Sequence, residues 1–209
     1  RAGHEHRAAR RDVARFGPCQ SVIATRLGRD ARQFPSIKRR GLDGMQLAGL
    51  VAEHIKFLKG MGLRVVVFVG GGGVGGPVVD RLHQLGHDNV IEVQFGGDAD
   101  DKRKYANKRS EMYGRLRDWL PIGALPKDAE LTNECAAVQY SFTNSDQIIL
   151  MKKERMIALG MVSPDTADAY ALTFAQVVPD PGPGDPSPSP AGRTTQRIGH
   201  DPREALRNV

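Results

Sequence analysis

Residues 64–95, RVVVFVGGGGVGGPVVDRLHQLGHDNVIEVQF, decide the fold of this chain. The run 64–69 is apolar at every position after Arg64, which is typical of a strand buried on both faces of a sheet. Glycines follow, Pro77 suits the first turn of a helix, and residues 89–95 form a second apolar strand. A strand–helix–strand unit predicts a right-handed crossover between parallel strands, so we expect an α/β protein.

The flanking sequence supplies the remaining elements. Asp43 has Gln46 three residues later, the spacing of a capping box at a helix start. Pro35 lacks an N–H, which favours an edge position for the strand around it. In chain order we expect strands over 21–27 and 32–40, helices over 43–60, 77–85, 107–120 and 127–135, a hairpin around 138–150, and a last helix that Ser163 caps, with Pro164 in its first position, running to about Val177.

Composition defines the limits of the folded domain. Of the 209 residues, 179–209 are rich in proline, glycine and serine and cannot bury enough apolar surface to order themselves. We expect one domain over 1–178, with residues 1–11 poorly ordered, and a flexible tail over 179–209. The formal net charge of +6 permits binding to a polyanion without requiring it.

Cysteine usage and hydropathy restrict the compartment. Cys19 and Cys135 are the only cysteines, so there is no disulfide framework, which fits a reducing compartment. No apolar run approaches the roughly 20 residues that span a bilayer, and no signal peptide is present at the N-terminus. We expect a cytoplasmic protein without a membrane partner.

The glycine cluster after the first apolar strand has two interpretations. Gly71, Gly73 and Gly76 satisfy GxGxxG between a strand and a helix, and Glu92 lies 21 residues after Gly71 in the next strand. A dinucleotide-binding domain uses this arrangement to hold a pyrophosphate at the helix N-terminus and the ribose on the acid. The alternative is a loop that needs glycine for tight packing. A Walker A loop is excluded, because no GK[ST] follows.

An ordered set of longer stretches resembles the C-terminal nuclease domain of phage terminase large subunits. The stretches are DVARFG (12–17), SVIATRLGRDARQFPSIKRRGLDGMQLA (21–48), VFVGGGGVGGPVVDRLHQLGH (67–87), KYANKRSEMYGRLRDWL (104–120) and SPDTADAYALTFA (163–175). They keep the order and spacing of that family over roughly residues 12–178. The ATPase motor domain that precedes the nuclease in the family is absent from this sequence.

The resemblance implies a fold and a chemistry. The fold is RNase H-like, a mixed central sheet flanked by helices, and the activity is that of a two-metal endonuclease using Mg²⁺ or Mn²⁺. Two such ions about 4 Å apart activate the attacking water and stabilise the leaving oxygen of a phosphodiester. The implied partners are double-stranded DNA, other terminase subunits and the portal protein, in the cytoplasm of a bacterial host cell.

Site residues follow from the same resemblance, position by position. Asp12 matches the first catalytic and metal-binding acid, on the first strand, and Asp168 matches the acid on the last helix. Asp165, one turn earlier, is either an accessory metal ligand or a helix N-terminal charge. Gly70 stands where the family has an aspartate, and residues 5–11 (EHRAARR) replace the apolar run expected of the first strand. We therefore expect weakened or lost cleavage.

A basic run lies beside the inferred site. We expect it to contact DNA phosphates, giving salt-sensitive, sequence-independent affinity; the alternative is a solvated loop and helix start. Its members are Lys102, Arg103, Lys104, Lys108 and Arg109.

Three hypotheses for the function of the chain result: an endonuclease domain of a DNA-packaging terminase with impaired activity, a dinucleotide-binding domain, and a non-catalytic remnant.

Overall fold

The computed structural model describes residues 20–178. The predictions for Asp12, for residues 1–11 and for the tail over 179–209 lie outside these described residues. Strands and helices alternate over much of the described part, which confirms the α/β class. Between residues 20 and 178, every helix is too short or too polar to span a bilayer.

The strands of this part of the chain pair two by two. β1 (Gln20–Ile23) is antiparallel to β2 (Ile37–Arg40), and β3 (Val67–Gly70) is parallel to β4 (Val90–Val93), as expected for the strand–helix–strand unit. β5 (Tyr140–Phe142) and β6 (Ile148–Leu150) form the predicted hairpin. The helices are α1 (Gly44–Gly60), α2 (Gly75–Gln84), α3 (Lys108–Trp119), α4 (Ala129–Ala137), α5 (Lys153–Ala158) and α6 (Asp165–Leu172).

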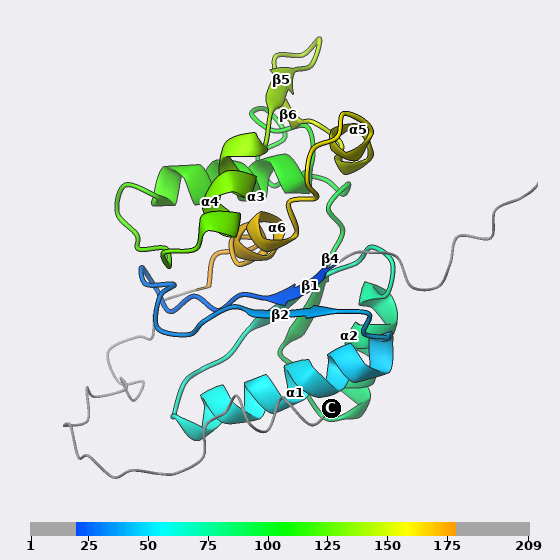
Figure 1. The fold of residues 1–209 in the computed structure, drawn as a ribbon, viewed down its shortest axis with the longest axis vertical. Coiled ribbons are helices and arrows are strands. Elements are labelled where there is room, and N and C mark those ends of the chain that lie inside the picture. The colour runs from blue at the N-terminus through cyan, green and yellow to red at the C-terminus, as the bar shows by residue number, and fades with distance from the viewer. Residues whose placement is uncertain (1–19, 179–209) are drawn as a thin grey trace, which may run out of the picture.

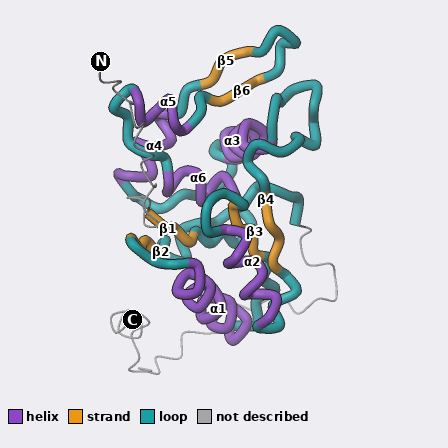
Figure 2. Tube along the Cα trace, turned by 90° about the vertical axis from the view of Figure 1, so that its right-hand side faces the viewer, coloured by secondary structure: helices purple, strands orange, loops and turns teal. Residues whose placement is uncertain are grey.

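Three layers are visible in Figures 1 and 2. Strands β1 to β4 lie in the middle, α1 and α2 cover one face, and α6, α3 and α4 cover the other. One apolar cluster, centred on Ile55 and Leu82, packs on the α1–α2 side, and a second, centred on Met112 and Tyr170, packs on the α3–α6 side. Successive strand residues contact opposite clusters, as the two-residue period of a strand requires.

The central sheet differs from the expectation. No hydrogen bond joins β1 to β3 within residues 20–178, so the four middle strands form two separate pairs instead of one mixed sheet. The resemblance implies a further strand leading up to Asp12, and that position lies outside the described residues. The helical layers and the parallel β3–β4 pair agree with the predicted fold, whereas a continuous sheet is not formed by the described strands.

Local sequence explains where the helices begin. Asp43 Oδ1 accepts a hydrogen bond from the Gln46 N–H at 2.8 Å, and Gln46 Oε1 accepts from the Asp43 N–H at 3.0 Å, which confirms the capping box. Asn107 caps α3 by accepting from the Ser110 N–H at 2.9 Å. α2 begins at Gly75, two residues before Pro77.

The last helix differs from the prediction at its start and at its end. The Ser163 hydroxyl donates to Asp165 Oδ1 at 2.9 Å, so it does not cap α6, which has Pro164 in the cap position. α6 ends at Leu172 and not near Val177, and the Thr173 hydroxyl donates back to the Tyr170 carbonyl at 2.8 Å. The short helix α5 was not predicted, because six residues carry too little periodicity.

Candidate functional site

Asp168 is the most enclosed acid of the candidate site. It lies in the first turn of α6 with 7% of its surface exposed. Its Oδ1 atom accepts from Arg109 Nε at 3.2 Å, from Arg109 Nη2 at 3.1 Å and from the Tyr113 hydroxyl at 2.7 Å. Its Oδ2 atom lies 3.5 Å from Lys153 Nζ. Oδ1 therefore accepts three hydrogen bonds, whereas Oδ2 faces the Lys153 ammonium.

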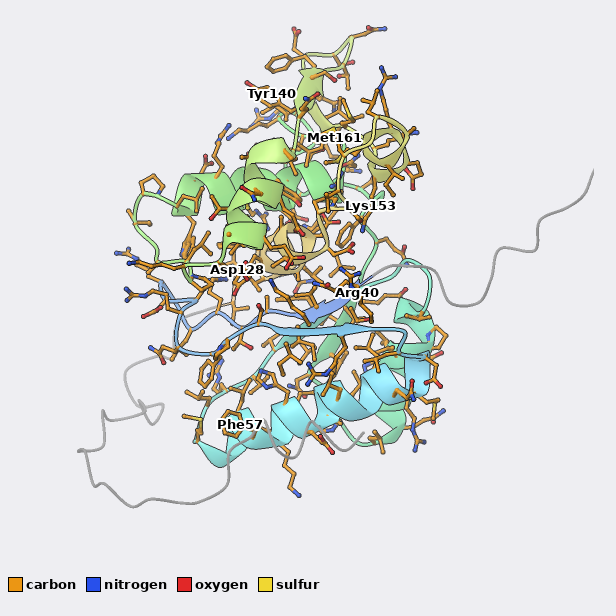
Figure 3. All side chains as sticks on the ribbon, viewed as in Figure 1. Arg40, Phe57, Asp128, Tyr140, Lys153 and Met161 are labelled. Carbon is orange, nitrogen blue, oxygen red and sulfur yellow. The ribbon has the colours of Figure 1, made fainter. Side chains whose placement is uncertain are left out.

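Asp165 lies one turn before Asp168 on the same helix. Its Oδ1 atom is 2.6 Å from Lys153 Nζ, and its Oδ2 atom accepts from the backbone N–H of Gln20 at 3.2 Å. Lys153 therefore lies between the two carboxylates, reaching from α5 toward α6 (Figure 3). Lys153 could not be predicted as part of the site, because its proximity to both acids depends on how α5 packs.

Tyr113 stays a neutral donor to Asp168. Burial raises the pKa of the Tyr113 hydroxyl well above its usual range, and the nearby Asp168 charge raises it further, while Arg109 opposes this. The hydroxyl therefore keeps its proton and holds Asp168 Oδ1 in place. The second oxygen of Asp168, Oδ2, is a hard donor of the kind that Mg²⁺ and Mn²⁺ prefer.

Two acids by themselves do not complete a metal site. Within residues 20–178 no group of three or more His, Cys, Asp or Glu side chains is arranged to hold a metal ion. The acid that the resemblance places first, Asp12, lies outside the described residues, and Gly70 offers no carboxylate. The donor type fits a divalent cation, while the described donor count is lower than a two-metal site needs.

Gly70 and both acids line the same groove, which has a volume of about 1170 Å³. Gly70 ends β3, the position where the resemblance implies an aspartate. A Cβ atom built on Gly70 would lie 3.3 Å from Cε1 of Phe95, so the Phe95 ring must move by a few tenths of an ångström to admit it.

The glycines after β3 have packing and backbone reasons for their identity. A Cβ at Gly71 would overlap the side chains of Gln94 and Glu92, and a Cβ at Gly75 would overlap the carbonyl of Gly70. Gly73 has a φ of 62°, in the left-handed region that favours glycine. These observations support the packing interpretation of the glycine cluster.

Part of the geometry that dinucleotide binding requires is present in the structure. The glycine loop runs from β3 into α2, whose N-terminus lacks a side-chain cap, and Gly72 and Gly73 line the groove. Glu92 is not among the groove residues; its Oε1 atom accepts from Gln94 Nε2 at 2.7 Å and lies 3.9 Å from a Cβ built on Gly76. Nucleotide binding stays a prediction.

The basic run divides into an exposed and a buried part. Lys102, Arg103 and Lys104 are exposed in the loop before α3, where Lys102 pairs with Asp98 at 2.5 Å. Lys104 lies 3.8 Å from Asp118 and above the Tyr105 ring. These three side chains are accessible to a polyanion.

Lys108 and Arg109, in contrast, are buried at the start of α3. Lys108 Nζ lies 2.8 Å from Asp100 Oδ2 and 2.9 Å from Glu111 Oε2. Arg109 pairs with Asp168 and donates to the Met151 carbonyl at 2.9 Å. Both cations therefore make internal ion pairs that hold the loop and the acidic site.

Glu111, which the sequence did not single out, organises the basic loop. It is 1% exposed, and it accepts from the backbone N–H groups of Asp100 and Asp101 at 3.0 and 3.1 Å. It also pairs with Lys108 and with Arg115, whose Nη2 atom lies 3.0 Å from Glu111 Oε1. The loop that carries the exposed lysines is thus fixed to α3.

The layered α/β fold of the described residues is similar to that of phage terminase nuclease domains. The nuclease domain of the large terminase subunit gp2 of bacterial virus Sf6 aligns with a TM-score of 0.65 and 18% identity, covering 78% of this chain and 85% of that chain. A substitution variant of the same domain solved with manganese gives 0.61 and 18%, covering 74% and 82%. A variant solved with calcium gives 0.63 and 19%, covering 78% and 84%.

These comparisons confirm the predicted resemblance at the level of the fold. The identities are too low to transfer residue roles. No family model matches the sequence, and no curated protein matches it.

Proposed function

We propose that this chain is a metal-dependent DNA endonuclease domain of a phage DNA-packaging terminase, with an RNase H-like fold. The observation that carries the proposal is the acid pair Asp165 and Asp168, which lines one groove with Gly70 on a terminase nuclease fold. The solved relatives with manganese and with calcium support a divalent cation as the cofactor class. Double-stranded DNA is the proposed substrate, with other terminase subunits and the portal protein as partners.

The proposed metal ligands are Asp12, Asp168 and, as an accessory, Asp165. Asp168 would use its Oδ2 atom, which faces Lys153, because Oδ1 already accepts three hydrogen bonds. When bound, Mg²⁺ or Mn²⁺ supplies an activated water and stabilises the leaving oxygen of the cleaved phosphodiester. Lys153 and Arg109 place positive charge beside the two carboxylates and so offset their mutual repulsion.

The proposed DNA contacts come from the exposed part of the basic run. Lys102, Arg103 and Lys104 would each meet a backbone phosphate, which makes binding dependent on salt and independent of sequence. Lys108 and Arg109 would act indirectly, because their internal ion pairs position the loop and Asp168.

Plasmid cleavage and DNA binding test this proposal together. The full chain is incubated with supercoiled plasmid and Mn²⁺, beside Asp168→Asn, and duplex binding is measured at low salt. We expect duplex binding by both proteins and slow nicking that Asp168→Asn abolishes. Folded protein that neither binds nor nicks DNA would indicate the non-catalytic remnant instead.

A dinucleotide-binding domain is the second candidate, favoured by the parallel β3–α2–β4 unit and the uncapped start of α2. Titration with NAD(H), NADP(H) and FAD tests it by thermal shift. A rise of Tm at about 1 mM ligand would support it, because a ligand of the folded state stabilises by mass action. Absence of a rise removes this candidate.

A further inference from the structure

Two exposed cations lie beside the acid pair and form no ion pair with another residue of the described part of the chain. Arg40 ends β2, and the only hydrogen bond of its side chain within that part runs from Nε to Gln20 Oε1 at 3.2 Å. Lys152 directly precedes α5, and its exposed ammonium contacts no carboxylate there. Lys102 and Arg32, which are also exposed, each pair with an aspartate.

Gln20 connects Arg40 to the acid pair. Gln20 and Arg40 are partners in the β1–β2 register, and the Gln20 N–H donates to Asp165 Oδ2 at 3.2 Å. Directly opposite residues of antiparallel strands have Cα atoms only about 4.5–5.5 Å apart. Gln20 and Gly41, the residue after Arg40, both line the groove. The Arg40 side chain therefore starts at the entrance of the groove, at the same end of the molecule as Lys153 (Figure 3).

Lys152 lies on the other side of the acids. It lines the groove and is followed by Lys153, whose ammonium lies 2.6 Å from Asp165 Oδ1. The preceding carbonyl, of Met151, accepts from Arg109 Nη1 at 2.9 Å, and the same guanidinium binds the second acid. One oxygen of Asp165 thus faces β1, which pairs with the strand of Arg40, and the other faces the helix that Lys152 precedes.

The groove carries an excess of positive charge. Lys153 and Arg109 bring two cations to the two acids. Over the whole groove lining the described cations outnumber the acids by five to three: Arg26, Arg64, Arg109, Lys152 and Lys153 against Glu154 and the acid pair. Arg40 adds a further cation at the entrance. Positive charge that lines a concave site raises the local concentration of an anionic ligand.

We propose that Arg40 and Lys152 bind the DNA backbone phosphates on either side of the phosphodiester that is cleaved at the acid pair. This inference rests on the proposed nuclease function and extends it, because it gives the DNA strand a path across the groove from β2 to α5. Lys152 follows β6, whose Ile148 N–H donates to the Lys104 carbonyl at 2.8 Å, so the path continues to the exposed basic loop. Such phosphate contacts supply affinity and position the strand without reading its sequence.

Salt-dependent binding of a labelled duplex to the full chain tests the proposal. The variants are Arg40→Gln, Lys152→Gln and their combination, with Arg40→Lys as the variant that keeps the charge. Lys56→Gln is the matched control, because Lys56 is an exposed lysine of α1, on the other side of the strands from α6. Binding is measured in EDTA, so that cleavage does not interfere, and Tm shows that each variant is folded.

We expect the slope of log affinity against log salt to become shallower by about one for each single variant, and by about two for their combination. Arg40→Lys and Lys56→Gln should both keep the slope of the unchanged chain. A residue that only stabilised the fold would not change this slope in folded protein, because the slope reports the number of phosphates that the protein neutralises.

Two results would overturn the proposal while the nuclease function stands. One is duplex binding with the same slope in Arg40→Gln and Lys152→Gln as in the unchanged chain. The other is an equal reduction of the slope by Lys56→Gln, which would indicate a general effect of net charge. A folded, unchanged chain that does not bind duplex DNA would instead refute the proposed function itself, and this inference with it.

Discussion

Replacement of Glu111 by glutamine tests whether the basic loop is held as described. Glu111 accepts from Lys108 Nζ, from Arg115 Nη2 and from the N–H groups of Asp100 and Asp101, at 2.9 to 3.1 Å. Glutamine keeps the shape of the side chain but removes its charge. Its NH₂ group replaces one carboxylate oxygen, so a hydrogen-bond donor then faces two of these donors. The variant therefore leaves buried donors without an acceptor.

The cost can be estimated from these contacts. Removing one partner of a buried ion pair destabilises by about 3–5 kcal/mol, since the remaining charge is uncompensated. Lys108 and Arg115 both keep Asp100, at 2.8 Å each, which moves the expectation to the lower end. We expect Glu111→Gln to lower the free energy of unfolding by about 3 kcal/mol. Urea denaturation measures it, with the exposed Asp118→Asn as a control near zero.

The pH dependence gives a second test of the same network. Burial raises the pKa of Glu111, but Lys108, the Asp100 and Asp101 amides and Arg115 outweigh it and hold the pKa below its ordinary value of 4.5. A carboxyl with a lowered folded-state pKa stabilises above its unfolded pKa and loses this contribution as pH falls through the folded value. The difference between wild type and variant should shrink below about pH 4. A cost under about 1 kcal/mol at pH 7 would refute the reasoning.

Three further predictions concern other parts of the molecule. Burial, reinforced by the charge of Glu134, raises the pKa of the Cys135 thiol to about 11. At pH 8, iodoacetamide should therefore alkylate Cys135 at least about tenfold more slowly than a free cysteine. An equal alkylation rate would contradict the burial of this thiol. Gly114→Ala places a Cβ against the Tyr105 hydroxyl and should lower the free energy of unfolding by about 1–3 kcal/mol, as measured by urea titration. An unchanged midpoint of urea unfolding would contradict this overlap. Lys104→Ala should reduce the slope of log affinity for duplex DNA against log salt by about one, and an unchanged slope would remove this residue from the proposed contacts.

Much of the fold follows from local sequence signals. Residues 64–95 predict the parallel β3–α2–β4 unit because apolar periodicity and glycine punctuation act within one short segment. Asp43 and Gln46 predict the start of α1 for the same reason. The separation of β1 from β3 among the described residues could not be predicted, because strand pairing depends on contacts between residues far apart in the chain, which local periodicity does not encode.

Less of the candidate site than of the fold could be predicted from the sequence. Asp168 stands out as an acid within an apolar helix, but its partners Arg109 and Tyr113 lie more than fifty residues earlier in the chain. The basic run gave no sign that Lys108 would turn inward while Lys104 stayed exposed. Side-chain direction at the start of α3 is set by tertiary packing, which residue type and spacing do not encode.

The proposed function places a metal-dependent nuclease centre in the groove, with one carboxylate missing at position 70. Plasmid cleavage with Mn²⁺ by Gly70→Asp, compared with the unchanged chain, tests it most directly, because this substitution restores a carboxylate at the position where the proposed centre lacks one. We predict a cleavage rate at least about 10²-fold higher, the scale of the loss when one preorganised electrostatic group is removed from an active site. Adding Asp168→Asn should abolish the gain. A folded Gly70→Asp protein that neither cleaves plasmid nor binds duplex DNA at low salt would contradict the claim.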